Sequence, residues 1–76
     1  MIKTIKIEKA HPTDPLAVKE FYLDAESDLS DLPTQSEGGR YGVCSTGSMA
    51  FVLTPGAGKS HLRILDGSGT WQEVAV

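Results

Sequence analysis

The segment from Leu53 to Leu65 contains the letters GAGKS, which are similar to the end of a phosphate-binding loop. That loop requires a further glycine at position 53, because its backbone N–H groups must curl around a phosphate before a helix begins. Position 53 is leucine, and the residues after Ser60 are too short and turn-rich for a helix of several turns. We therefore predict a glycine-rich turn between two strands and no nucleotide cofactor.

Asp24, Glu26 and Asp28 have the one-three-five spacing of the carboxylates in a calcium-binding loop. That loop also needs glycine at its sixth position and a bidentate glutamate at its twelfth, where this chain has Leu29 and Gln35. We expect the three carboxylates to lie on a solvated helical turn, near the positive end of its dipole. Because no paired cysteines or clustered histidines indicate zinc either, no metal is predicted.

Nucleophilic catalysis would need Cys44 beside His61, or Ser45 or Ser60 beside a histidine and an aspartate. No nucleophile elbow marks any of them, and a covalent mechanism also needs an oxyanion hole and a pocket, for which so short a chain has little room. Cys44 is predicted to be a small buried hydrophobic residue, and His11 and His61 to be surface residues. We predict no catalytic residue and expect the chain not to be an enzyme.

The chain has 76 residues, which predicts a single small β domain over residues 1–76 with marginal stability of its own. Its one cysteine excludes an internal disulfide, so association with other chains is the reinforcement that remains. The formal net charge of −3 argues against nucleic-acid binding, which needs a basic patch. No apolar run is long enough for a membrane span or a signal peptide, so we expect a soluble, unexported protein.

Two stretches of the N-terminal half have strand character. Residues 1–9 alternate and are rich in isoleucine, and the sequence HPTDP then interrupts the strand with two prolines. Residues 18–23 contain Val, Phe, Tyr and Leu, which favours a strand. Asp14 followed by Pro15 is also a helix-starting pattern, so a helix over residues 15–23 is the open alternative.

A short helical turn is predicted over DAESDLSDLP, with Asp24 as its N-cap and Pro33 as its stop. Leu29 and Leu32 lie three residues apart, on the side that would rest on a sheet. A glycine-rich loop follows over residues 34–42. From residue 41 onward, short apolar runs separated by Gly or Pro predict an antiparallel meander with strands over 41–45, 49–53, 61–65 and 70–76. The fold class is therefore mainly β, a small antiparallel sheet of about five to six strands with one helical turn.

The alternation of apolar residues assigns two faces to this meander. Met49, Phe51 and Leu53 share one side of their strand and, with Leu62 and Ile64 of the next, predict the hydrophobic core. The core prediction consists of Phe51, Leu62, Ile64 and Trp71. A second apolar face is a candidate protein interface. The possible contact residues are Tyr22, Val52, Leu65 and Trp71, the last being either a packing anchor or an interface anchor.

Several segments, taken in their order along the sequence, together resemble a group of small bacteriophage structural proteins, the head-fibre and tail-associated β modules. They are the strand KEFYLD (19–24), an acidic turn that ends in DLP (31–33), a glycine-bounded segment (42–48) and a hairpin of the form D-G-x-x-x-W, with Asp66, Gly67 and Trp71. The glycine-rich loop over 55–59 is longer than in the pattern.

The resemblance implies a non-enzymatic part of a virion, either a capsid fibre or decoration subunit or a tail or neck component. Such a protein is made in the host cytoplasm, binds no nucleic acid or membrane and acts by assembly with itself, with a trimer favoured, and with other virion proteins. The alternative function is a monomeric phage-encoded adaptor or inhibitor domain that binds a host protein through one exposed apolar or acidic patch.

Overall fold

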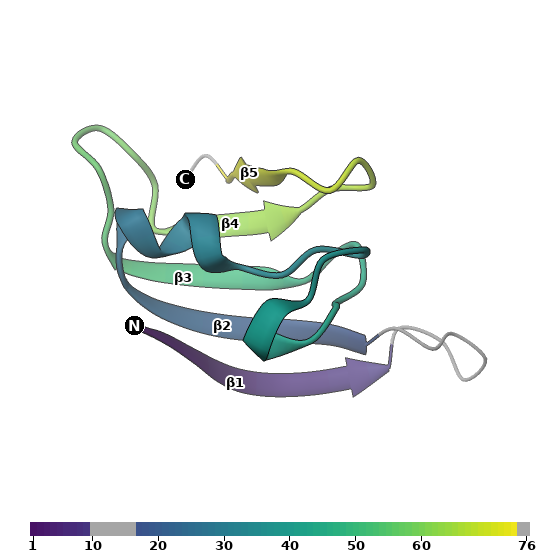
Figure 1. Cartoon of the computed structure of the whole chain (residues 1–76). Helices are drawn as coiled ribbons and strands as arrows, with labels where there is room; N and C mark the ends of the chain where they lie inside the picture. Colours follow the sequence, from purple (N-terminus) through teal and green to yellow (C-terminus); the bar gives the residue numbers. More distant parts are fainter. Residues whose placement is uncertain (10–16, 75–76) are drawn as a thin grey trace.

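The computed structural model describes residues 1–9 and 17–74, which form a five-stranded sheet with the strand order β1-β2-β3-β4-β5. Neighbouring strands are antiparallel except β2 and β3, which are parallel. In Figure 1 the sheet extends from β1 at the bottom to β5 at the top. The mainly β fold class predicted from the sequence is confirmed.

Strands β1 (Ile2–Lys9) and β2 (Ala17–Ala25) form the N-terminal antiparallel pair. The register of the pairing shifts between Thr4 and Lys6, which marks a β-bulge in β1. The predicted strand over residues 18–23 is confirmed, and the helical alternative for this stretch is wrong. The β-branched and aromatic side chains of β2 pack well on a pleated surface, and this packing favours the strand over the helix. The HPTDP sequence, including His11, lies outside the described residues.

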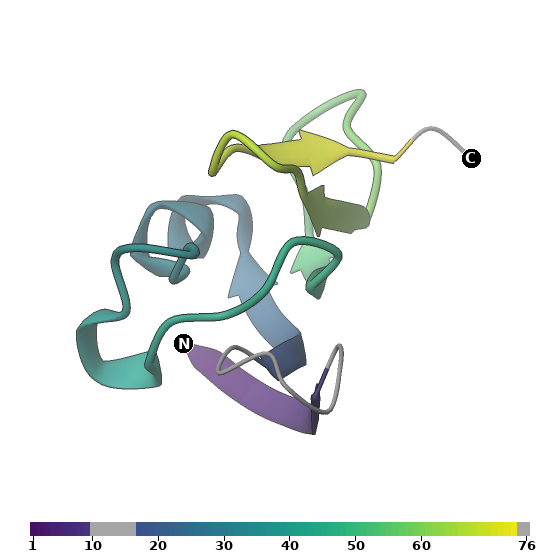
Figure 2. The same ribbon diagram turned by 90° about the vertical axis from the view of Figure 1, so that its right-hand side faces the viewer.

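Residues 26–48 connect β2 to the parallel strand β3 (Met49–Thr54) and cover one face of the sheet. This crossover begins with the 3-10 helix η1 (Glu26–Asp31) and contains a second 3-10 turn, η2 (Gly39–Tyr41). Figure 2 shows both turns on the same side of the sheet. Parallel strands cannot be joined by a tight hairpin, so the parallel pairing of β2 and β3 requires a connection of this length.

The short helical turn was predicted in the right place but with the wrong cap. Asp24 remains in β2, and Ala25 is the residue that precedes η1. The carboxylate of Asp28 accepts a hydrogen bond from the backbone N–H of Ala25 at 3.2 Å, so an acidic residue inside the turn satisfies this donor. Leu32 is buried and Leu29 packs against the core, as their spacing predicted.

Strands β4 (Leu62–Leu65) and β5 (Trp71–Glu73) complete an antiparallel meander with β3, as predicted. The strand expected over residues 41–45 is wrong, because these residues join no ladder. Both sides of β2 are already paired with β1 and β3, so this part of the crossover makes isolated backbone contacts instead. The Ser45 N–H donates to the Ala17 carbonyl at 2.8 Å.

The core lies between the sheet and the crossover. Phe21 is at its centre, with edge-to-face contacts to Tyr41 and Trp71 at ring-centroid distances of 6.4 and 6.2 Å. Trp71 packs against the core, in agreement with its prediction as a packing anchor. The buried apolar residues are Ile2, Phe21, Leu23, Leu32, Cys44, Ala50, Val52 and Leu65.

The faces of β3 and β4 were predicted in reverse. Val52 and Leu65 are 0% and 1% exposed, whereas Phe51 and Ile64, predicted as core, are 40% and 37% exposed. The alternation identifies the residues that share a face, but not the face that the crossover covers. Ala50 shares the covered face with Val52 and is 1% exposed.

Candidate functional site

The uncovered face of the sheet, here called the outer face, carries a stack of three rings. Phe51 on β3 stacks against Tyr22 on β2, with ring centroids 5.9 Å apart and planes inclined by 20°. On its other side Phe51 stacks against His61, at 5.2 Å and 11°. The parallel register places Tyr22 directly beside Phe51, so residues far apart in the sequence form one continuous strip.

Aliphatic side chains extend this strip over β3 and β4. Leu53 is 50% exposed, and Ile64 lies directly opposite Met49 across the two strands. Leu62 is opposite Phe51 in the same register. The result is an apolar surface centred on the middle strand of the sheet, of the kind that marks interaction sites in soluble proteins.

The imidazole of His61 is held in place at the edge of the stack. Its Nδ1 lies 2.6 Å from the Val52 carbonyl oxygen, and the Val52 N–H donates to the His61 carbonyl at 2.7 Å. Because a carbonyl only accepts, Nδ1 is the donor in this contact. The ring therefore presents its flat face to Phe51, and the edge that carries its nitrogen atoms is polar.

A hollow of about 450 Å³ lies beside the ring stack and over β1, lined by Lys3, Thr4, Ile5 and Tyr22. Ile5, at the bulge of β1, is 59% exposed. The outer face thus has a ridge of large apolar side chains on β3 and β4 and a depression on the β1 side.

The four contact residues predicted from the sequence are separated by the fold. Tyr22 is half-buried on the outer face, where a partner can reach it. Val52 and Leu65 are buried in the core, so neither is on the surface. Trp71 is half-buried on the covered side, and its indole Nε1 donates to the Pro33 carbonyl at 3.0 Å.

Sequence reasoning missed Phe51 and Ile64 as surface residues, whereas His61 is exposed, as predicted. Arg63 made the assignment of the two faces harder. It shares a side of β4 with Leu65, and a charged residue on that side suggests that the side faces solvent. Arg63 is nevertheless 3% exposed, and only its ion-pair partner explains this burial. The acid that neutralises it is 37 positions away in the sequence.

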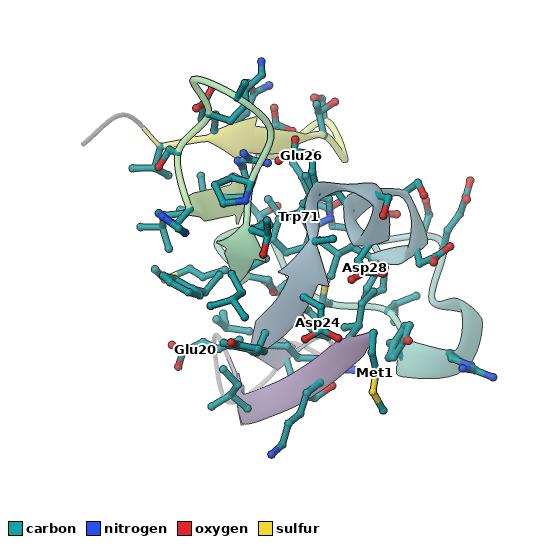
Figure 3. The ribbon with its side chains drawn as sticks, turned by 90° about the vertical axis from the view of Figure 1, so that its left-hand side faces the viewer. Met1, Glu20, Asp24, Glu26, Asp28 and Trp71 are labelled. Atoms are coloured by element: carbon teal, nitrogen blue, oxygen red, sulfur yellow. The ribbon has the colours of Figure 1, made fainter. Side chains whose placement is uncertain are left out.

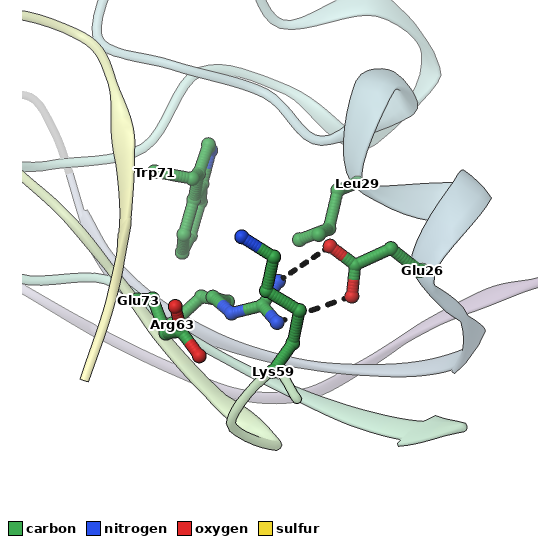
Figure 4. Close-up of a pocket in the computed structure, with 6 residues that line it drawn as sticks. All are labelled: Glu26, Leu29, Lys59, Arg63, Trp71 and Glu73. Atoms are coloured by element: carbon green, nitrogen blue, oxygen red, sulfur yellow. Dashed lines mark hydrogen bonds and ion pairs between the residues drawn. The ribbon is translucent and has the colours of Figure 1, made fainter. Parts of the chain in front are cut away.

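That acid is Glu26, which joins the crossover to β4 (Figure 4). Arg63 Nη1 and Nη2 donate to the two carboxylate oxygens of Glu26, both at 3.1 Å. Nη2 also donates to the Ser60 carbonyl at 2.7 Å, and the Gly56 N–H donates to Glu26 at 3.0 Å. The Arg63 side chain and this backbone N–H hold the pKa of Glu26 below its ordinary value.

These groups line a pocket of about 280 Å³ with Leu29, Lys59, Trp71 and Glu73. Lys59 belongs to the GAGKS segment, a turn in which Gly58 has φ +75° and the Lys59 N–H donates to the Gly56 carbonyl. The segment connects two antiparallel strands and not a strand to a helix, so it lacks the context of a phosphate loop. The carboxylates of Glu26 and Glu73 balance the charges of Arg63 and Lys59. The ion pair of Arg63 with Glu26 makes this pocket a junction between the crossover and β4.

Two of the three carboxylates with calcium-loop spacing lie at the Met1 amino group, and the third is apart from them (Figure 3). The Asp28 carboxylate is 2.8 Å from the Met1 amino group and Asp24 is 3.3 Å from it, whereas Glu26 reaches Arg63 on the other side of η1. Residues 1–9 and 17–74 contain no group of three or more His, Cys, Asp or Glu side chains placed to hold a metal. The carboxylates therefore serve contacts within the chain.

Cys44 is fully buried, as predicted, and its Sγ lies 3.6 Å from the Pro33 carbonyl oxygen. Burial raises the pKa of the thiol, which disfavours the thiolate that nucleophilic attack requires. His61, the candidate base, is on the opposite face of the sheet in contact with Phe51. The fold therefore separates this pair.

The D-G-S-G-T turn between β4 and β5 is organised by the Asp66 carboxylate. It accepts hydrogen bonds from the N–H groups of Ser68 and Thr70, both at 2.9 Å, and from the Gln72 side chain at 2.9 Å. These donors lower the pKa of Asp66 to about 2. The turn is further tied to the crossover by Gln35, whose Nε2 donates to the Asp66 carbonyl at 2.7 Å.

Comparisons of the chain with protein-family models, with curated proteins and with solved structures found no match. In the described part of the chain, no helix has the length and apolar character needed to cross a bilayer. Among the described residues, the outer face is the surface that no other segment covers.

Proposed function

We propose that this chain is a non-enzymatic structural protein of a bacteriophage virion, a capsid fibre or decoration subunit or a tail or neck component, which acts by self-association and assembly. The observation that carries the proposal is the apolar outer face, with Phe51, Leu53 and Ile64 each more than one third exposed. Covering such a surface with a partner lowers the free energy, because apolar side chains are removed from water.

The chemistry of the other clusters also favours a structural role. Glu26 and Arg63 bind each other, Asp66 binds its own turn, and the Cys44 thiol is buried. Each of these groups is used to hold the crossover or a turn in place. The resemblance of the chain to head-fibre and tail-associated modules then selects a virion as the assembly, with a trimer as the stoichiometry that the resemblance favours.

Mass spectrometry of purified particles of the source phage tests the virion role. We expect peptides of this chain in the particles at several copies per virion, retained after density-gradient purification. Absence from the particles, together with a strictly monomeric recombinant protein, would contradict the proposal and favour the adaptor that binds a host protein.

Light scattering across a roughly hundredfold dilution series, with thermal melting of the same samples, tests self-association. We expect an oligomer whose melting temperature falls on dilution, because dissociation removes the stabilisation that partner binding adds to the folded state. A melting temperature and molar mass that do not depend on concentration would contradict assembly by mass action.

A further inference from the structure

The outer face has the composition of an interface core with a polar rim. Lys3 on β1, Glu20 on β2 and Gln72 on β5 lie around it, and the outward positions of β3 and β4 hold no charged residue. Interfaces have this arrangement, with charged residues depleted at the centre and a solvated rim around it. The central residues are Met49, Phe51, Leu53, Leu62 and Ile64.

The exposed apolar area of this face can be compared with what a stable contact between proteins needs. With about 200 Å² for a fully exposed large side chain, exposures of 40%, 50% and 37% leave roughly 250 Å² uncovered at Phe51, Leu53 and Ile64. The half-buried Tyr22, Met49 and Leu62, the exposed His61 and the polar rim add to this area, and a specific interface buries roughly 800 Å² per partner.

The relief of the outer face is self-complementary. The ridge formed by Leu62 and Ile64 lies on the β4 side of Phe51, and the hollow lined by Lys3, Ile5 and Tyr22 lies on the β1 side. A twofold axis parallel to β3, between two facing sheets, brings the β4 side of each copy over the β1 side of the other. Ridge and hollow then meet twice, as an isologous contact requires.

We infer that a second copy of this chain covers the outer face, and that the two sheets pack face to face about a twofold axis parallel to β3, with Phe51 near the axis. This inference rests on the self-association in the proposed function, because it names the surface through which copies associate, and it replaces the trimer that the resemblance favours with a twofold dimer. Two sheets of this kind form a sandwich whose inner layer is the ring stack and its aliphatic neighbours.

The test compares two variants with matched exposure on opposite sides of the molecule. Ile64 on the outer face and Val43 on the crossover are both 37% exposed. We expect Ile64→Lys to weaken dimerisation at least about tenfold, because the dimer would bury an unpaired ammonium group, and Val43→Lys to leave it unchanged. Sedimentation equilibrium of both variants and of the parent chain measures the dissociation constants.

Two measurements keep a misfolded variant from being taken for a lost interface. The circular dichroism spectrum of each variant is compared with that of the parent chain, and Leu53→Lys, at a second exposed outer position, is measured in the same way. A folded monomer in both outer-face variants, with a dimer in Val43→Lys, supports the inference.

Other outcomes separate this inference from the proposed function. A parent oligomer that persists unchanged in Ile64→Lys and Leu53→Lys places the contact on another surface, and a parent trimer excludes twofold pairing. Either result overturns the inference, while detection of the chain in virions would still support the virion role. A parent chain that is monomeric at all concentrations overturns the inference as well, and only its absence from particles would then count against the virion role.

Discussion

Tyr22 and Leu23 are neighbours in β2, but their side chains lie in opposite environments. Leu23 is 0% exposed beneath the crossover, whereas Tyr22 lies on the outer face and stacks on Phe51. The same contrast holds along β3, where Val52 is buried and Phe51 is 40% exposed. Both faces of the sheet are apolar, and residues 1–9 and 17–74 cover only one of them.

The difference between the two faces lies in what covers them. On the covered face, polar groups of the crossover find partners on the sheet, such as the Ser48 hydroxyl, which accepts a hydrogen bond from the Lys19 N–H at 3.1 Å. The outer face has no segment of the described chain laid across it, as Figure 2 shows. Stability of the single chain therefore depends on the covered face, and the association that we propose depends on the outer one.

The largest effect is expected from truncating an aromatic ring on the covered face. Phe21→Ala removes a side chain that is 1% exposed and should lower the free energy of unfolding by about 3 to 5 kcal/mol, since it leaves a cavity. Phe51→Ala on the outer face should cost about 1 kcal/mol or less in the dilute monomer. Urea unfolding at low protein concentration measures both. Equal losses would contradict the distinction between the two faces.

A smaller effect is expected from the junction that fastens the crossover over its face. Glu26→Gln removes the charge opposite Arg63, whose side chain is 4% exposed, and should lower the free energy of unfolding by about 1 to 3 kcal/mol. Lys59→Gln is the control, because Lys59 lines the same pocket and the described residues provide its side chain with no hydrogen bond. Should the two variants lose the same stability, the bidentate pair does not fasten the crossover.

The smallest effect is expected at the β4–β5 turn, which lies outside both faces. The pKa of Asp66 is about 2 in the folded chain against an ordinary 3.8, so its ionised form stabilises the fold at neutral pH. That contribution is lost as the pH falls from about 4 to about 2, because the unfolded chain binds the proton first.

Asp66→Asn should therefore reduce stability slightly at pH 7 and flatten the decline between pH 4 and pH 2. Thermal melting over this range, with Asp31→Asn as a control on the exposed end of η1, measures the difference. An unchanged pH profile in Asp66→Asn would show that the carboxylate does not organise the turn.

Much of the local structure follows from local patterns. The run VKEFYL predicts β2, the alternation and turn residues predict β3 to β5, and the spacing of Leu29 and Leu32 predicts the side of η1 that contacts the core. The segment over residues 41–45 shows the limit of such patterns. It has the composition of a strand, but pairing requires a free strand edge, and both edges of β2 are occupied.

The candidate site was predicted in kind but not in place. The sequence contains two apolar faces, which is why an interface was expected, and it groups Met49, Phe51 and Leu53 correctly on one of them. Tyr22 was the one predicted contact residue that lies on the outer face. The stack of Tyr22 on Phe51 depends on the parallel register of β2 and β3, which joins residues from two distant segments.

By itself, the sequence determined the strands, the turns and the membership of each face, because these depend on neighbours a few residues apart. The tertiary structure alone decided which face is the core. That choice depends on the path of the crossover and on the pairing of Glu26 with Arg63 across 37 positions. Contacts at such separation have no local signature, so only the folded chain shows that Val52 is interior and Phe51 is surface.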